Sequence, residues 1–224
     1  MIAIVDAQTG NLRSVEKALR AVLDARGSAE AVVVTADADV VRRAERVVVP
    51  GQGAFGDCGR ALSRQAPLGR ALLEVIEAGT PYLGICLGMQ ILFEESDEAP
   101  GVPGLGVLRG RVVRIPDGLP DGHGGRLKVP HMGWNEVVPR RQPHALLAAE
   151  GPALHPPAAR PYYFVHSFHA QPSEPLVVEA TAGYGDLQLT AAVAVRNVFA
   201  VQFHPEKSQQ AGLSLLSAFV GWAG

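Results

Sequence analysis

A tight turn between an apolar run and a helical pattern constrains this chain more than any other feature. Residues 82–91 read Tyr-Leu-Gly-Ile-Cys-Leu-Gly-Met-Gln-Ile, so a Gly-Ile-Cys-Leu-Gly motif stands where a strand passes into a helix. Glycines on both sides of Cys86 let the backbone fold sharply. A turn of this kind lifts its central side chain above the carboxyl end of a parallel strand. The motif therefore predicts an α/β fold with a reactive group at that edge of the sheet.

The first half of the chain alternates strand and helix patterns, which predicts a mainly parallel sheet with helices on both faces. Short apolar runs predict the strands, and apolar residues at helical spacing predict the helices. The expected strands are Ile2–Asp6, Ala31–Thr35, Arg46–Pro50 and Pro81–Cys86; the expected helices are 12–23, Asp37–Ala44, 68–76 and Leu87–Glu95.

The second half favours antiparallel strands added to the parallel core. Asn197 is a predicted turn residue, and Ser208 is a candidate cap for a last helix. Residues 116–126 and 140–161 predict surface loops. The expected strands are Val107–Ile115, Trp134–Val138, Tyr162–His169, Leu176–Thr181, Ala191–Val195 and Val198–Phe203.

Composition limits the class of protein. A chain of 224 residues that is 47% hydrophobic can bury a full core, and we expect one domain over 1–224. A net charge of -2 favours neither nucleic acid nor an anionic membrane. The N-terminus lacks a secretory pattern, and no apolar stretch reaches the roughly 18 residues of a membrane span. Two cysteines form neither a disulfide framework nor a zinc site. We expect a cytoplasmic protein with no metal and no cofactor.

Cys86 is the candidate nucleophile. The helix that follows the turn points its N-terminus at the sulfur, which favours the thiolate. The N–H of Leu87 is then free to donate to a developing oxyanion. The alternative is a buried cysteine at the end of a core strand, and both glycines argue against it. Cys58 has no strand of its own before it, so we interpret it as an ordinary small residue.

His204 and Glu206 are the best partners for such a nucleophile. His204 follows an apolar strand, and the next residue, Pro205, keeps the segment extended. Residues i and i+2 of an extended segment share a face, so Glu206 can orient the imidazole. His166 and His169 are the rivals; three apart on one strand, they would point to opposite faces and make a poor metal pair. His131 stays ambiguous.

A glycine-rich turn follows the third predicted strand. Residues 51–56 match G-x-G-x-x-G, the fingerprint of a dinucleotide site. We reject that reading because the motif follows the third strand and not the first. The other interpretation is that backbone N–H groups near Gln52 and Gly53 supply the second oxyanion donor, for which glycine gives the close approach.

The motifs at 84–90 (Gly-Ile-Cys-Leu-Gly-Met-Gln) and 204–206 (His-Pro-Glu) are similar to those of class I, or triad, glutamine amidotransferases. More narrowly, the chain resembles the glutaminase subunits of imidazole glycerol phosphate synthase. The narrower likeness rests on Gly-Asn-Leu-Arg-Ser-Val (10–15), Pro-Gly-Gln-Gly-Ala-Phe (50–55), Pro-His-Met-Gly-Trp-Asn (130–135), Tyr-Phe-Val-His-Ser (163–167) and Gln-Phe-His-Pro-Glu-Lys (202–207). The resemblance covers nearly the whole chain. It implies a flavodoxin-like α/β fold with a mixed, mostly parallel central sheet.

The resemblance also implies a reaction and its residues. Cys86 would attack the glutamine carboxamide, with His204 as base and Glu206 as its orienter, and a glutamyl thioester would form and be hydrolysed. Glutamine would be bound by Gln90, by Glu98 and by the backbone of His166, Ser167 and Phe168.

A partner follows from the same resemblance. Ammonia would pass through a channel into a (β/α)8-barrel cyclase subunit of a heterodimer. There it would yield imidazole glycerol phosphate and an aminoimidazole carboxamide ribotide, in histidine biosynthesis. The positions implied at or near the partner interface are Asn11, Trp134, Tyr163 and Lys207.

Two other functions compete with this one. The chain could be another thiol hydrolase on the same scaffold, such as a γ-glutamyl hydrolase or a different amidotransferase. It could also be a subunit that kept the fold without catalysis. The block at 130–135 argues against the first, and the intact Cys86, His204 and Glu206 argue against the second. We also expect weak glutaminase activity in the isolated chain, because the 51–53 turn is flexible enough to turn an N–H away.

Overall fold

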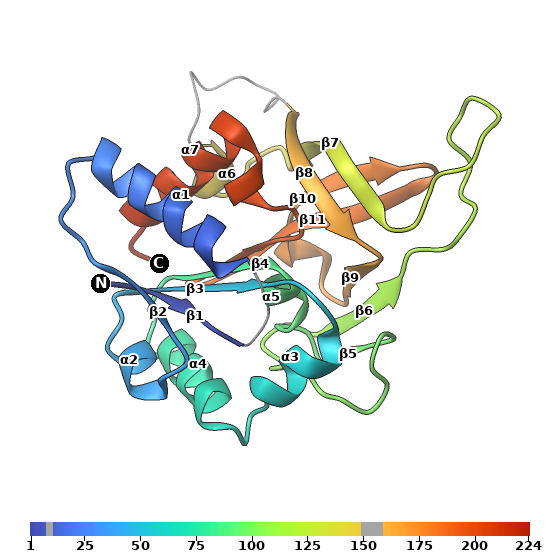
Figure 1. Ribbon diagram of the computed structural model, residues 1–224. Coiled ribbons are helices and arrows are strands. Elements are labelled where there is room, and N and C mark those ends of the chain that lie inside the picture. The colour runs from blue at the N-terminus through green and yellow to red at the C-terminus, as the bar shows by residue number, and fades with distance from the viewer. Residues whose placement is uncertain (8–10, 149–158) are drawn as a thin grey trace.

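A nine-stranded mixed sheet runs through the molecule (Figure 1). The computed structural model describes residues 1–7, 11–148 and 159–224. The first five strands in sheet order are parallel to one another, and the last four continue the sheet in antiparallel fashion. In sheet order the strands are β2 (Val32–Thr35), β1 (Ile2–Val5), β3 (Arg46–Gly51), β4 (Tyr82–Cys86), β12 (Val198–Val201), β11 (Leu187–Val195), β10 (Val178–Tyr184), β7 (His131–Pro139) and β8 (Arg160–His166).

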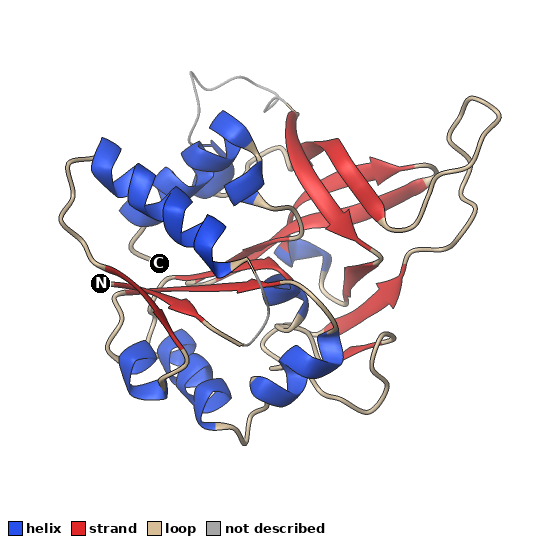
Figure 2. Cartoon of the chain, in the orientation of Figure 1, coloured by secondary structure: helices blue, strands red, loops and turns tan. Residues whose placement is uncertain are grey.

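Helices cover both faces of the parallel half, as predicted (Figure 2). One face carries α1 (Leu12–Ala25), α6 (Ala145–Ala148) and α7 (Gln209–Gly221). The other carries α2 (Ala38–Arg42), α3 (Phe55–Ala61), α4 (Pro67–Glu77) and α5 (Leu87–Gln90). None of the helices in the described ranges is long and apolar enough to cross a membrane.

Strand β1 shows how the apolar runs produce these two layers. All four of its residues are buried. Successive side chains of a strand point to opposite faces. Ile2 and Ile4 therefore pack with residues of α1 and α7, whereas Ala3 and Val5 pack with residues of α2 and α4. A continuous apolar run is what a strand needs when helices cover both of its sides.

A second sheet was not predicted. It has three strands, β5 (Glu95–Ser96), β6 (Gly110–Arg114) and β9 (Phe168–Pro172). The single strand expected over Tyr162–His169 is wrong, because it divides at Ser167 into β8 and β9, which belong to different sheets. The carbonyl of Ser167 accepts from the N–H of Ile115 at 2.8 Å, which holds the crossover against the end of β6. His166 and His169 consequently lie on separate strands, and not on opposite faces of one.

The helix expected over Leu87–Glu95 is wrong beyond Gln90, where α5 ends. The carbonyls of the next residues are taken by a distant segment: Leu105 donates to Ile91 at 2.7 Å, and Val107 to Leu92 at 2.8 Å. Tertiary hydrogen bonds replace the helical ones there, and a local sequence pattern cannot predict them.

Ser208 does not cap α7 through its side chain. Its hydroxyl instead donates to the His204 carbonyl at 2.6 Å and accepts from the Tyr163 N–H at 3.0 Å. Asn197 lies in the β11–β12 turn, as predicted.

The 116–126 stretch contains no named helix or strand, in line with the predicted loop. The 140–161 stretch contains α6 and the start of β8, so the loop expectation fails at both. Its residues 149–158, and Gly10 of the 10–15 motif, lie outside the described residues.

Candidate active site

The turn after β4 is a strained elbow. Cys86 has φ 53° and ψ −105°, a region that residues with a side chain seldom occupy. A Cβ on Gly84 would stand 2.5 Å from the Gly88 carbonyl oxygen, and one on Gly88 would overlap the carbonyl oxygen of Val49. The two glycines of the motif are therefore required by close backbone packing, which holds the elbow and presents Cys86.

The glycine-rich turn after β3 lies beside this elbow. Gly51 pairs with Cys86 in the parallel register. A Cβ on Gly51 would meet the Leu87 Cβ at 2.7 Å, so the two segments touch through their backbones. Gly53 has φ 108°, which only glycine adopts readily. The structure thus brings Gln52, Gly53 and Leu87 together around the sulfur.

His204 and Glu206 come from the segment that follows β12. His204 is extended, but Glu206 lies in a 3-10 helix, η2 (Pro205–Lys207), so the extended segment expected through Glu206 is wrong. The imidazole Nδ1 and the Glu206 Oε1 are 2.9 Å apart, and both side chains are almost fully buried. Burial acts to lower the pKa of His204, but interactions with Cys86 and then with Glu206 outweigh it and raise the pKa from 6.5 to about 9. The imidazole therefore holds a proton at neutral pH beside the sulfur.

The other ring nitrogen of His204 faces the nucleophile without a well-aligned hydrogen bond. His204 Nε2 is buried and has no hydrogen-bond partner among the described residues. Cys86 nevertheless contributes to the raised pKa of His204, so the two groups are close enough to interact. Catalytic hydrogen bonds of this kind tighten when substrate is bound.

Asn11 contacts the orienting carboxylate. Its Nδ2 donates to Glu206 Oε1 at 3.0 Å, so this oxygen accepts from the asparagine as well as from the imidazole. The resemblance implies a place for Asn11 at or near the partner interface. The structure shows that Asn11 is in direct contact with Glu206, the third residue of the proposed triad.

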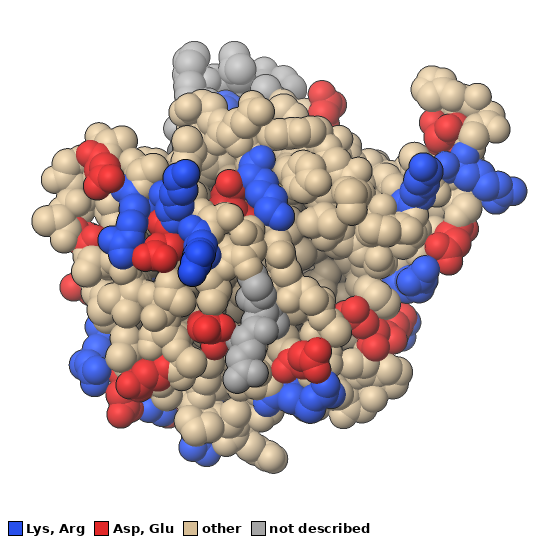
Figure 3. Space-filling view, viewed as in Figure 1, with Lys and Arg blue, Asp and Glu red and all other residues tan. Residues whose placement is uncertain are grey.

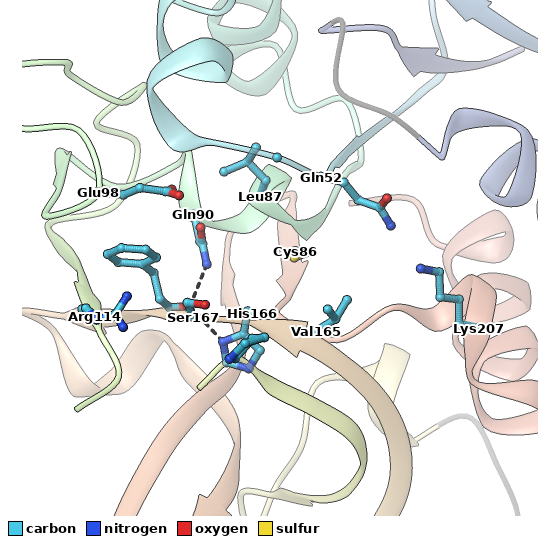
Figure 4. Close-up of a pocket in the computed structure, with 13 residues that line it drawn as sticks. Gln52, Cys86, Leu87, Gln90, Glu98, Arg114, Val165, His166, Ser167 and Lys207 are labelled. Carbon is cyan, nitrogen blue, oxygen red and sulfur yellow. Dashed lines mark hydrogen bonds between the residues drawn. The ribbon is translucent and has the colours of Figure 1, made fainter. Parts of the chain in front are cut away.

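A pocket of about 460 Å³ opens over Cys86 (Figure 4). This volume suits a small-molecule site. Every expected oxyanion and substrate residue lines it, and so does Lys207; His204 and Glu206 do not line it directly. The lining residues are Gln52, Gly53, Cys86, Leu87, Gln90, Glu98, Arg114, Pro130, Val165, His166, Ser167, Phe168 and Lys207.

Gln90 has a fixed orientation at this pocket. Its NH₂ group donates to the Phe168 carbonyl at 2.9 Å and to Gln202 Oε1 at 3.0 Å. Gln90 Oε1 is thereby left as an acceptor, and Figure 4 shows it turned to the same side of the pocket as Glu98. One oxygen of Glu98 is already occupied, because Oε2 accepts from the Phe55 N–H at 2.8 Å.

Arg114 is a charged residue of the pocket that the sequence patterns did not select. It ends β6 and pairs with Phe168 of β9. Its guanidinium also reaches Asp117 at 3.2 Å. Its position near the end of a predicted strand is the one sequence feature that could have marked Arg114 as a candidate. Only the crossover between the two sheets brings that strand end close to Cys86.

Two buried histidines form a pair at the pocket: His166 lines it, and His131 lies next to His166. His131 Nδ1 and His166 Nε2 are 3.0 Å apart, and His166 Nδ1 lies 2.8 Å from the Phe168 carbonyl. Burial lowers the pKa of His131 to about 4 and, with the nearby His131 ring, that of His166 to about 3. Both rings are neutral at pH 7, so neither acts as a cation toward substrate.

The expected interface residues form a continuous group beside the triad. Trp134 is 49% exposed and meets the Tyr163 ring edge-on, with centroids 6.1 Å apart. Lys207 Nζ lies 5.9 Å from the centroid of the same Tyr163 ring. The Tyr163 carbonyl accepts from the His204 N–H at 2.9 Å. This exposed group is thus tied directly to the backbone of the proposed base.

Solved structures with a similar fold carry related titles. One titled "Crystal structure of glutamine amidotransferase" has a TM-score of 0.68 at 21% identity and covers 100% of this chain and 98% of its own. Another, "Structure of PurLQS from Thermotoga maritima", has a TM-score of 0.69 at 17% identity and covers 100% and 98%. At these identities the likeness shows the fold alone.

Sequence comparison goes further. The family model "Glutamine amidotransferase class-I" matches residues 4–221. "Imidazole glycerol phosphate synthase subunit HisH" of Aromatoleum aromaticum is 50% identical, over 99% of this chain and 98% of its own length. The protein of the same name from Methanothermobacter thermautotrophicus is 44% identical, over 98% of each chain. The chain therefore belongs to the class I glutamine amidotransferases and, within them, to the HisH subunits of imidazole glycerol phosphate synthase.

Proposed function

We propose that this chain hydrolyses glutamine with Cys86 as nucleophile, His204 as base and acid, and Glu206 as the group that orients the imidazole. The observation that carries the proposal is the strained elbow, which presents Cys86 to the pocket beside a buried imidazole bound to a carboxylate. Nucleophile, base and orienting acid are the parts that a thiol acyl-transfer site needs.

The reaction follows from these positions. His204 holds the proton taken from the Cys86 thiol, and the sulfur attacks the carboxamide carbon of glutamine. The oxyanion so formed accepts from the Leu87 N–H and from the turn at Gln52 and Gly53. The C–N bond breaks, ammonia leaves with the proton from the imidazole, and a glutamyl thioester remains. A water then gives its proton to His204, attacks the thioester and releases glutamate and the thiol.

The pocket also supports one orientation of the substrate. With the carboxamide at Cys86, the zwitterionic end of glutamine points toward Gln90, Glu98 and Arg114. Gln90 Oε1 and the Glu98 carboxylate can accept from the α-ammonium group, and the Arg114 guanidinium can donate to the α-carboxylate. The backbone of His166, Ser167 and Phe168 closes the same end.

The ammonia would go to a second subunit. The relatives are named as subunits of a synthase, and we propose a (β/α)8-barrel cyclase as the partner, in a cytoplasmic heterodimer of histidine biosynthesis. Free ammonia becomes ammonium in water and loses its nucleophilic lone pair, so a protected passage is needed. The exposed group of Trp134, Tyr163 and Lys207, together with Asn11, is the proposed contact face, and 1–224 is proposed as one domain.

The decisive experiment replaces the two cysteines one at a time. Cys86→Ala should abolish glutamate release while the variant still binds purified cyclase. Cys58→Ala is the matched control: Cys58 is buried in α3, and burial raises its pKa to about 12, so it is an inert thiol. That variant should keep its activity.

Glutamate release by the Cys86→Ala protein would remove Cys86 as nucleophile. Activity that is fast without the cyclase and unchanged by it would instead contradict the proposed dependence on a partner. No transfer of ammonia to the purified cyclase would favour another hydrolase of the same family.

A further inference from the structure

Gln202 is a buried polar residue to which the proposed reaction gives no role. It has no exposed surface, and it lies within an apolar segment between β12 and His204. Its Nε2 donates to the Cys86 sulfur at 3.5 Å. Because residues i and i+2 of an extended segment share a face, Gln202 and His204 both reach the nucleophile from the same side of the sheet.

The direction of this hydrogen bond is fixed by its neighbours. The Phe168 carbonyl can only accept, so the group of Gln90 that faces it at 2.9 Å must be the NH₂. The same NH₂ lies 3.0 Å from Gln202, so the atom of Gln202 that faces Gln90 must be Oε1. The NH₂ of Gln202 is then left to face the sulfur. The amide cannot be reversed without placing two donors against each other.

A donor in this position distinguishes the two forms of the cysteine. A thiol sulfur is a weak acceptor, whereas a thiolate accepts a charge-assisted hydrogen bond. Hydrogen bonding to a charged form favours that form. The site is closed to water on this side, since Gln202 is fully buried, and a donor there has no competing solvent.

We propose that Gln202 is a further catalytic residue, which stabilises the Cys86 thiolate through its NH₂ and fixes the acceptor oxygen of Gln90 toward substrate through its own Oε1. This inference rests on Cys86 as the proposed nucleophile. The buried amide of Gln202 thus contacts both the reacting sulfur of Cys86 and Gln90, which lines the substrate pocket.

The test measures the alkylation of Cys86 by iodoacetamide in the full chain across a range of pH, with the modified peptide identified by mass spectrometry. Gln202→Met keeps the size of the side chain and removes the donor. It should slow alkylation about tenfold at about pH 7, the loss expected for one hydrogen bond to a charged group. The difference should narrow as the pH rises, because base then forms the thiolate without help from the donor.

Gln202→Glu sharpens the test. It keeps an acceptor for Gln90 but sets a carboxyl group against the sulfur, so alkylation at neutral pH should be slower than in Gln202→Met. The KM for glutamine should rise in the Met variant more than in the Glu variant. Gln188→Met, at an exposed position of β11, is the matched control and should alkylate like the parent protein.

Two results would overturn the inference. One is alkylation at the parental rate in both Gln202 variants. The other is slowing by the same factor at every pH, which is the signature of a distorted site and not of a lost donor. A variant that folds poorly is recognised because Cys58, which is buried in the folded protein, becomes alkylated as well. Glutamate release by Cys86→Ala would defeat the proposed nucleophile itself, independently of how the Gln202 variants behave.

Discussion

Glu98 and Arg114 carry opposite charges into one end of the same pocket (Figure 4). A free amino acid presents an ammonium and a carboxylate together, and a site that holds both recognises glutamine itself and not a glutamine side chain within a peptide. The Arg114 side chain is 51% exposed and also forms an ion pair with Asp117. Solvent therefore weakens the attraction between Arg114 and the substrate carboxylate.

Replacement of Arg114 with Gln should therefore raise the KM for glutamine about tenfold, with a smaller change in kcat. The KM for glutaminamide, which lacks the α-carboxylate, should rise much less. The variant should therefore no longer discriminate between the two substrates. Arg111→Gln on the same strand is the control, since Arg111 is 53% exposed, pairs with Asp97 and does not line the pocket. Equal losses for both substrates would exclude contact between Arg114 and the carboxylate.

At the scale of elements, β7 and β8 are joined across their register by the His131–His166 pair. The Phe168 carbonyl accepts from His166 Nδ1, so His166 Nε2 is the acceptor for His131 Nδ1. His131 Nε2 is then the acceptor for Asn135, whose NH₂ lies 3.2 Å away. Both rings are fixed as neutral Nδ1–H tautomers. This line of hydrogen bonds connects the 130–135 block with His166 and Phe168, which line the pocket.

Nitrogen NMR of labelled protein should show both rings as Nδ1–H tautomers that do not titrate between about pH 5.5 and pH 8. Their folded pKa values, about 4 and about 3, lie below the unfolded value of 6.5. The unfolded state therefore binds more protons between these limits, and stability must fall as the pH drops from 6.5 toward 4. A urea midpoint that stays constant over that range, or a ring that titrates near its ordinary value, would contradict the buried pair.

At the scale of the whole molecule, the proposed contact face for a partner carries exposed apolar side chains. Met132 and Trp134 are 61% and 49% exposed on the same strand. Figure 3 shows basic and acidic side chains interspersed over the face in view, so charge does not single out one region there. On this proposal, recognition of the second subunit rests on the group of Trp134, Tyr163 and Lys207 beside the triad.

Trp134→Ala should weaken binding of the cyclase by ~2 kcal/mol, about thirtyfold, as truncation of an interface aromatic does. Its own unfolding free energy should change little, because half of the side chain is already in water. Leu176→Ala is the control, since Leu176 is 85% exposed on a different surface element. Titration calorimetry with purified cyclase measures both; equal affinities for the two variants would remove Trp134 from the interface.

The sequence alone determined much of the parallel half and the reactive elbow, since both depend on local chemistry. Apolar runs of β1, β3 and β4 can be satisfied only between helices, and Gly84 and Gly88 permit only one kind of turn around Cys86. The pairing of His204 with Glu206 is also predicted from the sequence, but on an extended segment, whereas the structure makes it across the start of the 3-10 helix η2.

Tertiary structure alone decided what completes the site. Residues 162–169 look like one strand until Ser167 is held against Ile115 and the chain changes sheets, which brings Arg114 to the pocket. In the sequence, Gln202 is one polar residue within the apolar run 198–203. Its role appears only when β4 and β12 pair side by side, because the partners of a buried amide lie far away in sequence. Local patterns encode conformation, whereas hydrogen-bond partners of buried groups are set by which strands become neighbours.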